Sequence, residues 1–236
     1  AHADKLGVEF IMADVETIED LGATKIVHTD EGDFEAKAVI LATGAAHAML
    51  GVEGEMKLAG MGVSYCATCD GAFFRGRTVA VVGGGDVAVE DAIFLAGLCK
   101  KVYLIHRRDS LRAADSLQKK LMALPNVEIL WNSEVTKIQG EDMVESLVVL
   151  RKQEKKEQVL EVNGVFIAVG ILPNTESFRG LVDMDEKGYI IADESCTTSV
   201  PGIFAAGDIR KKALRQIITA VADGANAVNS VQNYFI

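Results

Sequence analysis

The stretch Thr78-Val79-Ala80-Val81-Val82-Gly83-Gly84-Gly85-Asp86-Val87-Ala88 decides the fold. Its apolar run, residues 78–82, is typical of a buried parallel strand, and the glycines that follow end that strand. Residues 86–98 then carry apolar side chains at helical spacing, and residues 101–105 are again strand-like. This order of strand, glycine turn, helix and strand predicts an α/β domain built around a parallel sheet.

The glycine turn matches the pattern G-x-G-x-x-A. Glycine lets the backbone turn sharply and approach a pyrophosphate, and the N-terminus of the next helix offers free N–H groups and the positive end of its dipole. A glycine triplet alone would also suit an ordinary tight turn. Because a strand precedes it and a helix follows it, we predict a dinucleotide site that includes Gly83, Gly85, Asp86 and Ala88.

The end of the next strand indicates which dinucleotide binds. An NAD site usually places an acid about 20 residues after the glycines, where it holds the ribose hydroxyls. Here that position reads His106-Arg107-Arg108, and Arg112 follows. An acid would repel the extra phosphate of NADP, whereas guanidinium groups bind phosphate through paired hydrogen bonds. We therefore predict NADP; the alternative is a solvated basic patch at a strand end.

Two of the four cysteines, Cys66 and Cys69, form a C-x-x-C pair followed by Asp70. This spacing allows a small disulfide and also half of a zinc site. No second pair of this kind occurs and the four histidines are scattered, so we favour a redox disulfide over zinc or inert thiols. Asp70 could protonate a thiolate formed when the disulfide is reduced, or could cap a helix. Cys99 and Cys196 are interpreted as structural.

A fourth candidate site lies near the end of the chain. The segment 202–208, Gly-Ile-Phe-Ala-Ala-Gly-Asp, reads as a short strand that delivers Asp208 beside a glycine, and Arg215-Gln216 follows. An acid in this position can accept hydrogen bonds from a ribitol or ribose hydroxyl. By itself this signal is weak, because Gly-Asp is common in turns.

Other elements are expected from the same patterns. Buried strands are expected at residues 37–44, 126–130 and 166–170, and an antiparallel pair at 144–150 and 159–162, joined by a charged turn. Helices are expected at residues 110–124 and 214–235.

Composition bounds the class of protein. The 236 residues carry 34 acidic and 24 basic side chains, a net charge of −10, which argues against a general nucleic-acid surface. No apolar run approaches the length that spans a membrane, and the start of the chain has no signal pattern. With so few cysteines, a disulfide-stapled secreted scaffold is excluded and we expect a cytoplasmic protein that binds no membrane.

Together these motifs resemble the low-molecular-weight thioredoxin reductases of bacteria, in the pyridine nucleotide-disulfide oxidoreductase family. The matching segments extend over nearly the whole chain and include residues 42–44, 66–71, 83–88, 106–109, 170–175, 198–208 and 215–217. The combination of C-A-T-C-D with a glycine-rich NADP motif shortly after it is specific to this group.

The resemblance implies an α/β fold with two Rossmann-like three-layer domains, the NADP domain being inserted into the FAD domain. Projected onto this chain, residues 1–47 and 171–236 would be FAD domain and residues 48–170 the NADP domain. The family begins with a further strand and a G-x-G-x-x-G loop that cradles FAD, and no such motif precedes Ala42. We therefore expect an FAD domain that is incomplete at its N-terminus.

The resemblance also implies residue roles. Cys69 would lie nearest the flavin, Cys66 would attack the thioredoxin disulfide, and Asp70 would supply a proton. The residues expected to bind the cofactors, the hinge glycine included, are Thr43, Gly44, Gly83, Gly85, Asp86, Ala88, His106, Arg107, Arg108, Arg112, Gly170, Gly207, Asp208, Arg215, Gln216 and Ile217. No metal is expected, and the family implies a homodimer.

The implied reaction is reduction of the thioredoxin disulfide by NADPH, through FAD and the Cys66–Cys69 disulfide. One alternative is a related flavin reductase with another disulfide acceptor, such as a peroxiredoxin-linked enzyme, which would prefer NADH and lack Arg107-Arg108. A second alternative is a non-catalytic NADP-binding fragment with an idle redox pair. A zinc-binding structural module that uses Cys66 and Cys69 is a third.

Overall fold

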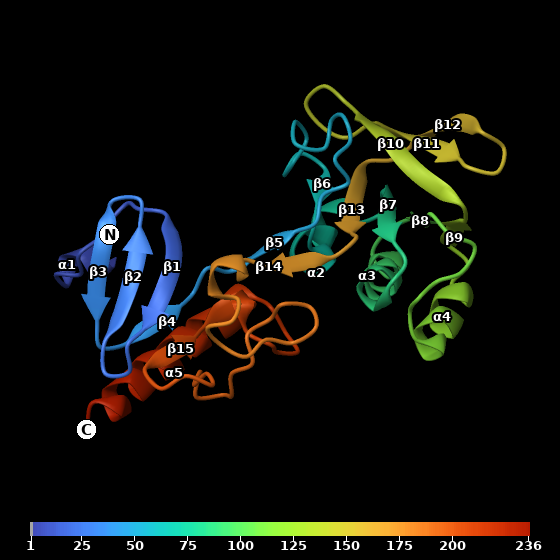
Figure 1. Ribbon diagram of the computed structural model, residues 1–236. Coiled ribbons are helices and arrows are strands. Elements are labelled where there is room, and N and C mark those ends of the chain that lie inside the picture. Colours follow the sequence, from blue (N-terminus) through green and yellow to red (C-terminus); the bar gives the residue numbers. More distant parts are fainter. Residues whose placement is uncertain (1) are drawn as a thin grey trace. The chain divides into compact units, whose positions relative to one another are not determined.

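The computed structural model describes residues 2–236, which divide into two compact units (Figure 1). Unit 1 combines the residues up to Ala46 with Leu172–Ile236, and unit 2 is His47–Ile171. The chain passes from one unit to the other at strands β5 (Ala45–His47) and β14 (Ile171–Pro173), which pair with each other. Both units mix helices with parallel strands, so the predicted α/β class is confirmed.

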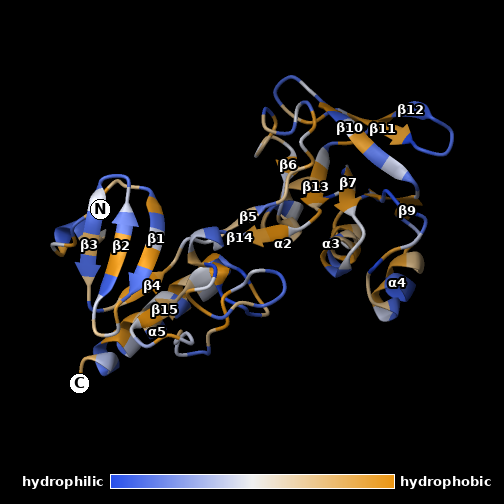
Figure 2. Cartoon of the chain, in the orientation of Figure 1, coloured by the Kyte–Doolittle hydropathy of each residue, from blue (hydrophilic) through white to orange (hydrophobic). Residues whose placement is uncertain are grey.

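Unit 2 is built on a five-stranded sheet in which every neighbouring pair is parallel. In sheet order its strands are β6 (Val63–Ser64), β13 (Gly164–Ala168), β7 (Thr78–Gly83), β8 (Lys101–Ile105) and β9 (Val127–Leu130). The strand β7 is the apolar run of the glycine motif, and Figure 2 shows the hydrophobic character of β7 and β13.

The two faces of this sheet are covered by different layers. Val79 and Val81 of β7 are fully buried among α3 (Asp86–Ala96) and α4 (Asp115–Met122). Ala80 and Val82 point to the opposite face, which packs against the antiparallel sheet of β10 (Ser133–Gln139), β11 (Ser146–Arg151) and β12 (Lys156–Glu161). This alternation is the two-residue period of a strand buried on both sides, and it makes unit 2 a three-layer structure.

Two short helices follow β6 in unit 2. They are α2 (Ala67–Asp70) and the 3-10 helix η1 (Gly71–Phe74). Phe74 of η1 packs edge-on against Phe166 of β13, with ring centroids 5.3 Å apart. The segment that carries the C-x-x-C pair is thereby attached to the helical side of the parallel sheet.

Unit 1 contains a parallel pair, β4 (Val39–Leu41) with β15 (Ile203–Ala205), and a three-stranded antiparallel sheet. That sheet consists of β1 (Val15–Asp20), β2 (Lys25–Thr29) and β3 (Gly32–Ala36). The remaining elements are α1 (His2–Lys5), the 3-10 helices η2 (Glu176–Phe178) and η3 (Gly207–Ile209), and α5 (Ile217–Tyr234).

The helix α5 begins at a capping box, in which Gln216 and Thr219 exchange hydrogen bonds between side chain and backbone. It packs on β15 and η3 and buries Ala227 completely. Its large apolar side chains Ile217 and Ile218 are nevertheless 85% and 72% exposed. Residues 2–236 thus leave an apolar part of this helix uncovered.

Two expected elements, a strand and a helix, are clearly shorter in the structure than predicted. The strand expected at 37–44 is only Val39–Leu41, and Ile40 is partly exposed. The helix expected at 110–124 begins at Asp115, because the backbone N–H groups of Arg112 and Ala114 bond to Gly84 O and Asp86 Oδ1 instead of forming a helical turn. The strand β10 was not anticipated.

Candidate functional site

Cys66 and Cys69 are joined by a disulfide at the start of α2. Cys66 is the N-cap residue of this short helix, and its Sγ accepts a hydrogen bond from the backbone N–H of Cys69 at 3.2 Å. Cys66 is half-buried and Cys69 is exposed within the described chain. An N–H directed at sulfur favours the thiolate over the thiol, so this turn suits thiol–disulfide chemistry.

Asp70 does not cap a helix with its side chain. Its Oδ2 accepts a hydrogen bond from the hydroxyl of Ser64 at 2.7 Å, and the Ser64 Oγ also accepts from the backbone N–H of Cys66 at 3.1 Å. Ser64 is 5% exposed and ends strand β6. This serine was not among the predicted site residues, although its position two residues before Cys66 was a signal. The hydroxyl fixes the Asp70 carboxyl beside the redox turn.

Glu55 is a second buried polar residue that the sequence did not reveal. Glu55 is fully buried, and its carboxylate accepts hydrogen bonds from the backbone N–H groups of Leu50 at 3.0 Å and Gly51 at 2.7 Å. It also accepts from the hydroxyl of Tyr65 at 2.9 Å. Burial and the Glu55 hydrogen bond raise the pKa of Tyr65 to about 12. Glu55 therefore connects the residue before Cys66 to the loop at the start of unit 2.

The glycine turn after β7 has little room for side chains. Gly83 has φ +155°, and a Cβ there would lie 2.4 Å from Ala168 O and 2.7 Å from the Ala88 methyl. A Cβ on Gly84 would lie 2.1 Å from the His106 ring, so Gly84 is required as well, although the sequence analysis did not select it. Gly85 is the N-cap of α3, and a Cβ there would meet nothing within 4 Å.

His106 and Asp86 are held by protein groups. The His106 ring Nε2 lies 3.0 Å from Ser110 O, and the side chain is 5% exposed. Burial lowers the pKa of His106, and the charges of Arg112 and Arg108 lower it further. Asp86 Oδ1 accepts from the backbone N–H of Ala114 at 2.8 Å. Near neutral pH, positive charge at this place therefore comes from the arginines and not from His106.

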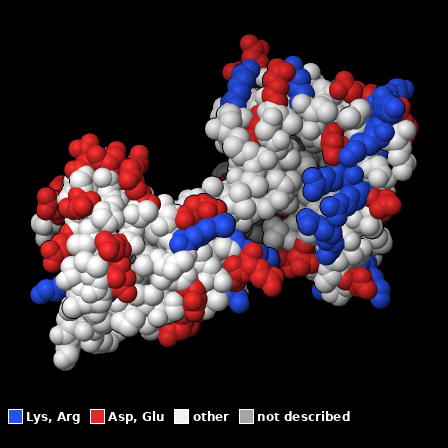
Figure 3. Space-filling view, in the orientation of Figure 1, with Lys and Arg blue, Asp and Glu red and all other residues white. Residues whose placement is uncertain are grey.

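A cavity of about 450 Å³ opens beside the glycine turn. Its wall includes Gly83, Gly84, His106, Arg107 and Arg112, whereas Arg108 is not part of it. Figure 3 shows that lysines and arginines gather on one face of unit 2. The cavity lies at the carboxyl ends of β7 and β8, which is where open α/β sheets bind ligands, and its size suits a dinucleotide half. These residues fit NADP.

In unit 1, two candidate segments meet at one end of the parallel pair. Thr43 and Gly44 follow β4, and Gly207 and Asp208 follow β15, so the parallel register brings both to the carboxyl ends of the strands. Thr43 Oγ donates to Asn174 O at 2.5 Å, and Asn174 Nδ2 donates to Thr43 O at 3.0 Å. Asn174 is a further residue that the motif analysis did not select for this site.

One carboxylate oxygen of Asp208 has no hydrogen-bond donor within residues 2–236. Among the described residues its Oδ1 is buried and accepts no hydrogen bond, although a carboxylate oxygen in such a position normally has a donor. A hydroxyl of a bound ligand would satisfy it. Gly44 has φ +70°, and a Cβ there would meet nothing within 4 Å; Ile217, the first residue of α5, is exposed. These residues fit the ribityl part of a flavin.

Three more of the predicted cofactor-binding residues, Arg215, Gln216 and Gly170, make contacts within the protein. The Arg215 guanidinium lies over the Tyr189 ring, 3.9 Å from its centroid, and Nε donates to Asp208 O at 3.3 Å. Gln216 is the N-cap of α5. Gly170, with φ +141°, accepts a hydrogen bond from Ala48 N–H at 3.0 Å, next to the passage between the units.

The two lone cysteines are buried. Cys99 Sγ donates to Phe74 O and Cys196 Sγ donates to Asp223 O, each at 3.3 Å. Within residues 2–236 no three His, Cys, Asp or Glu side chains gather in a way that could hold a metal ion. No helix in the same range is both long and apolar enough to cross a membrane.

Residues 2–224 match the family model described as pyridine nucleotide-disulphide oxidoreductase. The parallel sheet with its glycine turn and the Cys66–Cys69 disulfide both lie within this matched range. The chain belongs to the pyridine nucleotide-disulphide oxidoreductase family.

Among the members of this family, the chain is similar to bacterial thioredoxin reductases. The chain is 44% identical to a thioredoxin reductase of Peptoclostridium acidaminophilum, covering 99% of this chain and 76% of the relative. It is also 44% identical to a thioredoxin reductase of Bacillus subtilis strain 168, covering 99% and 74%. The crystal structure of thioredoxin reductase from Streptococcus pyogenes MGAS5005 matches with a TM-score of 0.94 and 47% identity, covering 98% and 76%. The resemblance predicted from the motifs is confirmed.

Proposed function

We propose that this chain provides the NADP site and the redox disulfide of an NADPH-dependent thioredoxin-disulfide reductase. One observation carries the proposal: unit 2 holds both the Cys66–Cys69 disulfide and a dinucleotide-sized cavity walled by Arg107 and Arg112. The similarity to thioredoxin reductases along 98–99% of the chain supports the same acceptor.

The chemistry at the disulfide follows from the residues around it. When bound, FAD would carry the electron pair from NADPH to this disulfide. Two electrons break the Sγ–Sγ bond and leave two sulfur anions, one of which takes a proton from Asp70. Cys66 remains as the thiolate, favoured by the N–H of Cys69. Asp70 then regains a proton from water.

Thiol–disulfide exchange completes the cycle. The Cys66 thiolate attacks one sulfur of the thioredoxin disulfide, so a mixed disulfide forms and the second thioredoxin sulfur leaves as a thiolate that takes up a proton. Cys69, after losing its proton, attacks Cys66 Sγ. This step expels the other thioredoxin sulfur and restores the Cys66–Cys69 disulfide.

The finer assignments belong to the same proposal. Unit 2 would be the NADP domain and unit 1 the FAD domain, with FAD contacts from residues 43–44, 207–208 and 215–217. The arginines in the cavity wall support NADP over NAD. We also propose a homodimer in the cytoplasm, as the resemblance implies.

The test uses Cys66→Ser in the full-length gene product, with Cys99→Ser as the matched control because Cys99 is a buried free thiol that takes no part in the disulfide. The Cys66 variant should lose thioredoxin reduction, yet NADPH should still bleach the flavin absorbance. The Cys99 variant should retain both. Loss of both reactions in Cys66→Ser alone would contradict the role given to Cys66.

A further inference from the structure

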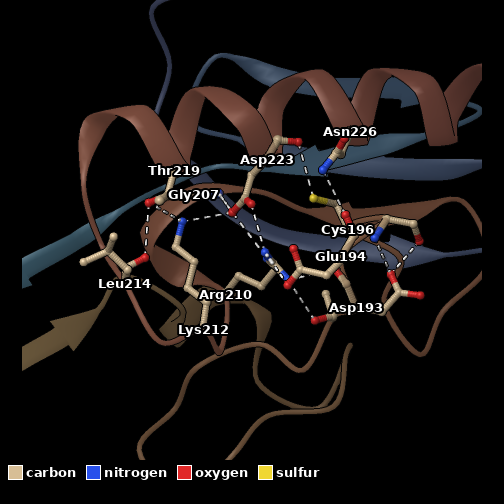
Figure 4. Close-up of polar contacts among 12 residues, drawn as sticks. Asp193, Glu194, Cys196, Gly207, Arg210, Lys212, Leu214, Thr219, Asp223 and Asn226 are labelled. Carbon is tan, nitrogen blue, oxygen red and sulfur yellow. Dashed lines mark hydrogen bonds and ion pairs between the residues drawn. The ribbon is translucent and has the colours of Figure 1, made fainter.

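A buried cluster of charges lies between the start of α5 and the turn that carries Gly207 and Asp208 (Figure 4). At its centre is Asp223 of α5, whose side chain is 6% exposed. Asp223 Oδ1 accepts from Arg210 Nη2 at 2.9 Å, and Oδ2 accepts from Lys212 Nζ and from the backbone N–H of Gly207, each at 3.0 Å. One carboxylate therefore fixes two cations and the turn itself.

The two cations are as buried as the acid that holds them. The side chains of Arg210 and Lys212 are 4% and 6% exposed. Burial would raise the pKa of Asp223, but hydrogen bonds from Arg210, Lys212 and the Gly207 amide lower it below its usual value. Buried charges held in this way are costly to separate, so the cluster has one preferred arrangement.

Asp208 lies next to this cluster, and its Oδ1 receives no hydrogen bond from the described residues. Lys212 Nζ is 3.7 Å from Asp208 Oδ1, within ion-pair range but beyond a hydrogen bond. The same Nζ donates to Asp223 Oδ2 at 3.0 Å and to Thr219 Oγ at 3.4 Å. Asp208 Oδ1 consequently stays free to accept a hydrogen bond.

We propose that Asp223 is a positioning residue for the flavin, which holds Lys212 away from Asp208 so that Asp208 Oδ1 remains open to a ribityl hydroxyl. This inference rests on the proposed FAD site. Without the Asp223 carboxylate, Lys212 is released and its nearest anion is Asp208. Lys212 then occupies the oxygen that the flavin needs, and it competes with the cofactor.

The experiment measures FAD affinity by flavin fluorescence, on apoprotein of the full-length gene product. Asp223→Asn should weaken FAD binding about ten-fold or more, because a charge-assisted contact to the ligand is lost. The double variant Asp223→Asn with Lys212→Met should recover to within about three-fold of the wild type, because the competing cation has gone. A purely structural network would make the double variant weaker than the single one.

The matched control is Glu194→Gln, which removes one negative charge from the same cluster. Glu194 contacts Arg210 at 3.4 Å, but its side chain is 91% exposed, so this variant should leave FAD affinity within about two-fold. If Asp223→Asn does not fold, the double variant still decides: binding close to wild type supports the proposal, and a loss beyond ten-fold overturns it.

Two further results would be decisive. Unchanged FAD affinity in Asp223→Asn would overturn the positioning role and leave the proposed function intact. Failure of the wild-type gene product to bind FAD at all would overturn both, and the two failures are therefore distinguishable.

Discussion

Replacing Arg107 by Ala should change the choice between NADPH and NADH. Arg107 and Arg112 line the cavity beside the glycine turn, and His106, which also lines it, is kept neutral by burial. The 2′-phosphate of NADPH would therefore depend on guanidinium groups. A charge-assisted hydrogen bond contributes about 1.5–3 kcal/mol, and the exposure of Arg107 places this one near the lower end. The KM for NADPH should rise about ten-fold.

The assay is steady-state thioredoxin reduction by the full-length gene product at fixed ionic strength, since salt screens exposed charges. The KM for NADH should change less than about two-fold, because NADH lacks the phosphate. Arg108→Ala is the matched control: it removes a neighbouring arginine that does not line the cavity, and its effect on NADPH should be clearly smaller. Equal changes for NADPH and NADH in Arg107→Ala would refute the assignment.

Two further variants test the fold and its pH response. Gly83→Ala places a Cβ 2.4 Å from Ala168 O at φ +155°, so it should lower the free energy of unfolding by about 3 kcal/mol. At Gly85 a Cβ would meet nothing within 4 Å, so Gly85→Ala should lower the free energy of unfolding by no more than about 1 kcal/mol. Similar denaturation midpoints for the two variants would contradict this difference. Burial raises the pKa of Asp91 to about 6, and the charge of Glu90 adds to this effect. Between about pH 4 and pH 6 the native state therefore binds more protons than the unfolded state, so the stability of the wild type falls as pH rises through this range. At pH 8 the Asp91→Asn variant should therefore unfold at a higher denaturant concentration than the wild type, whereas at pH 4 the two should unfold together. An equal shift at both pH values would show that the charge of Asp91 is not the reason for the difference in stability.

The sequence predicted those parts of the site that depend on local constraints. The strand β7, the glycine turn and α3 could be read from one continuous stretch, residues 78–98, because apolar periodicity and glycine geometry act over short distances. The Cys66–Cys69 pairing was favoured for the same reason, since only two residues lie between the cysteines.

Features that depend on distant contacts could not be read in this way. Asp223 is 16 residues from Gly207, and only folding brings its carboxylate to that amide. The strand β10 was missed because its apolar residues, such as Val135 and Ile138, are interrupted by a shift in register near Thr136, which breaks the two-residue period. Glu55 resembles any surface acid in the sequence and is recognisable only from its buried partners.

The central claim is that electrons from NADPH reach the Cys66–Cys69 disulfide. The direct measurement is anaerobic addition of one equivalent of NADPH to the full-length gene product, followed by alkylation and mass spectrometry of the peptide that contains both cysteines. We expect both thiols to become alkylated, while Cys99 and Cys196 are alkylated equally with and without NADPH. Complete NADPH oxidation with the Cys66–Cys69 disulfide still intact would contradict the claim.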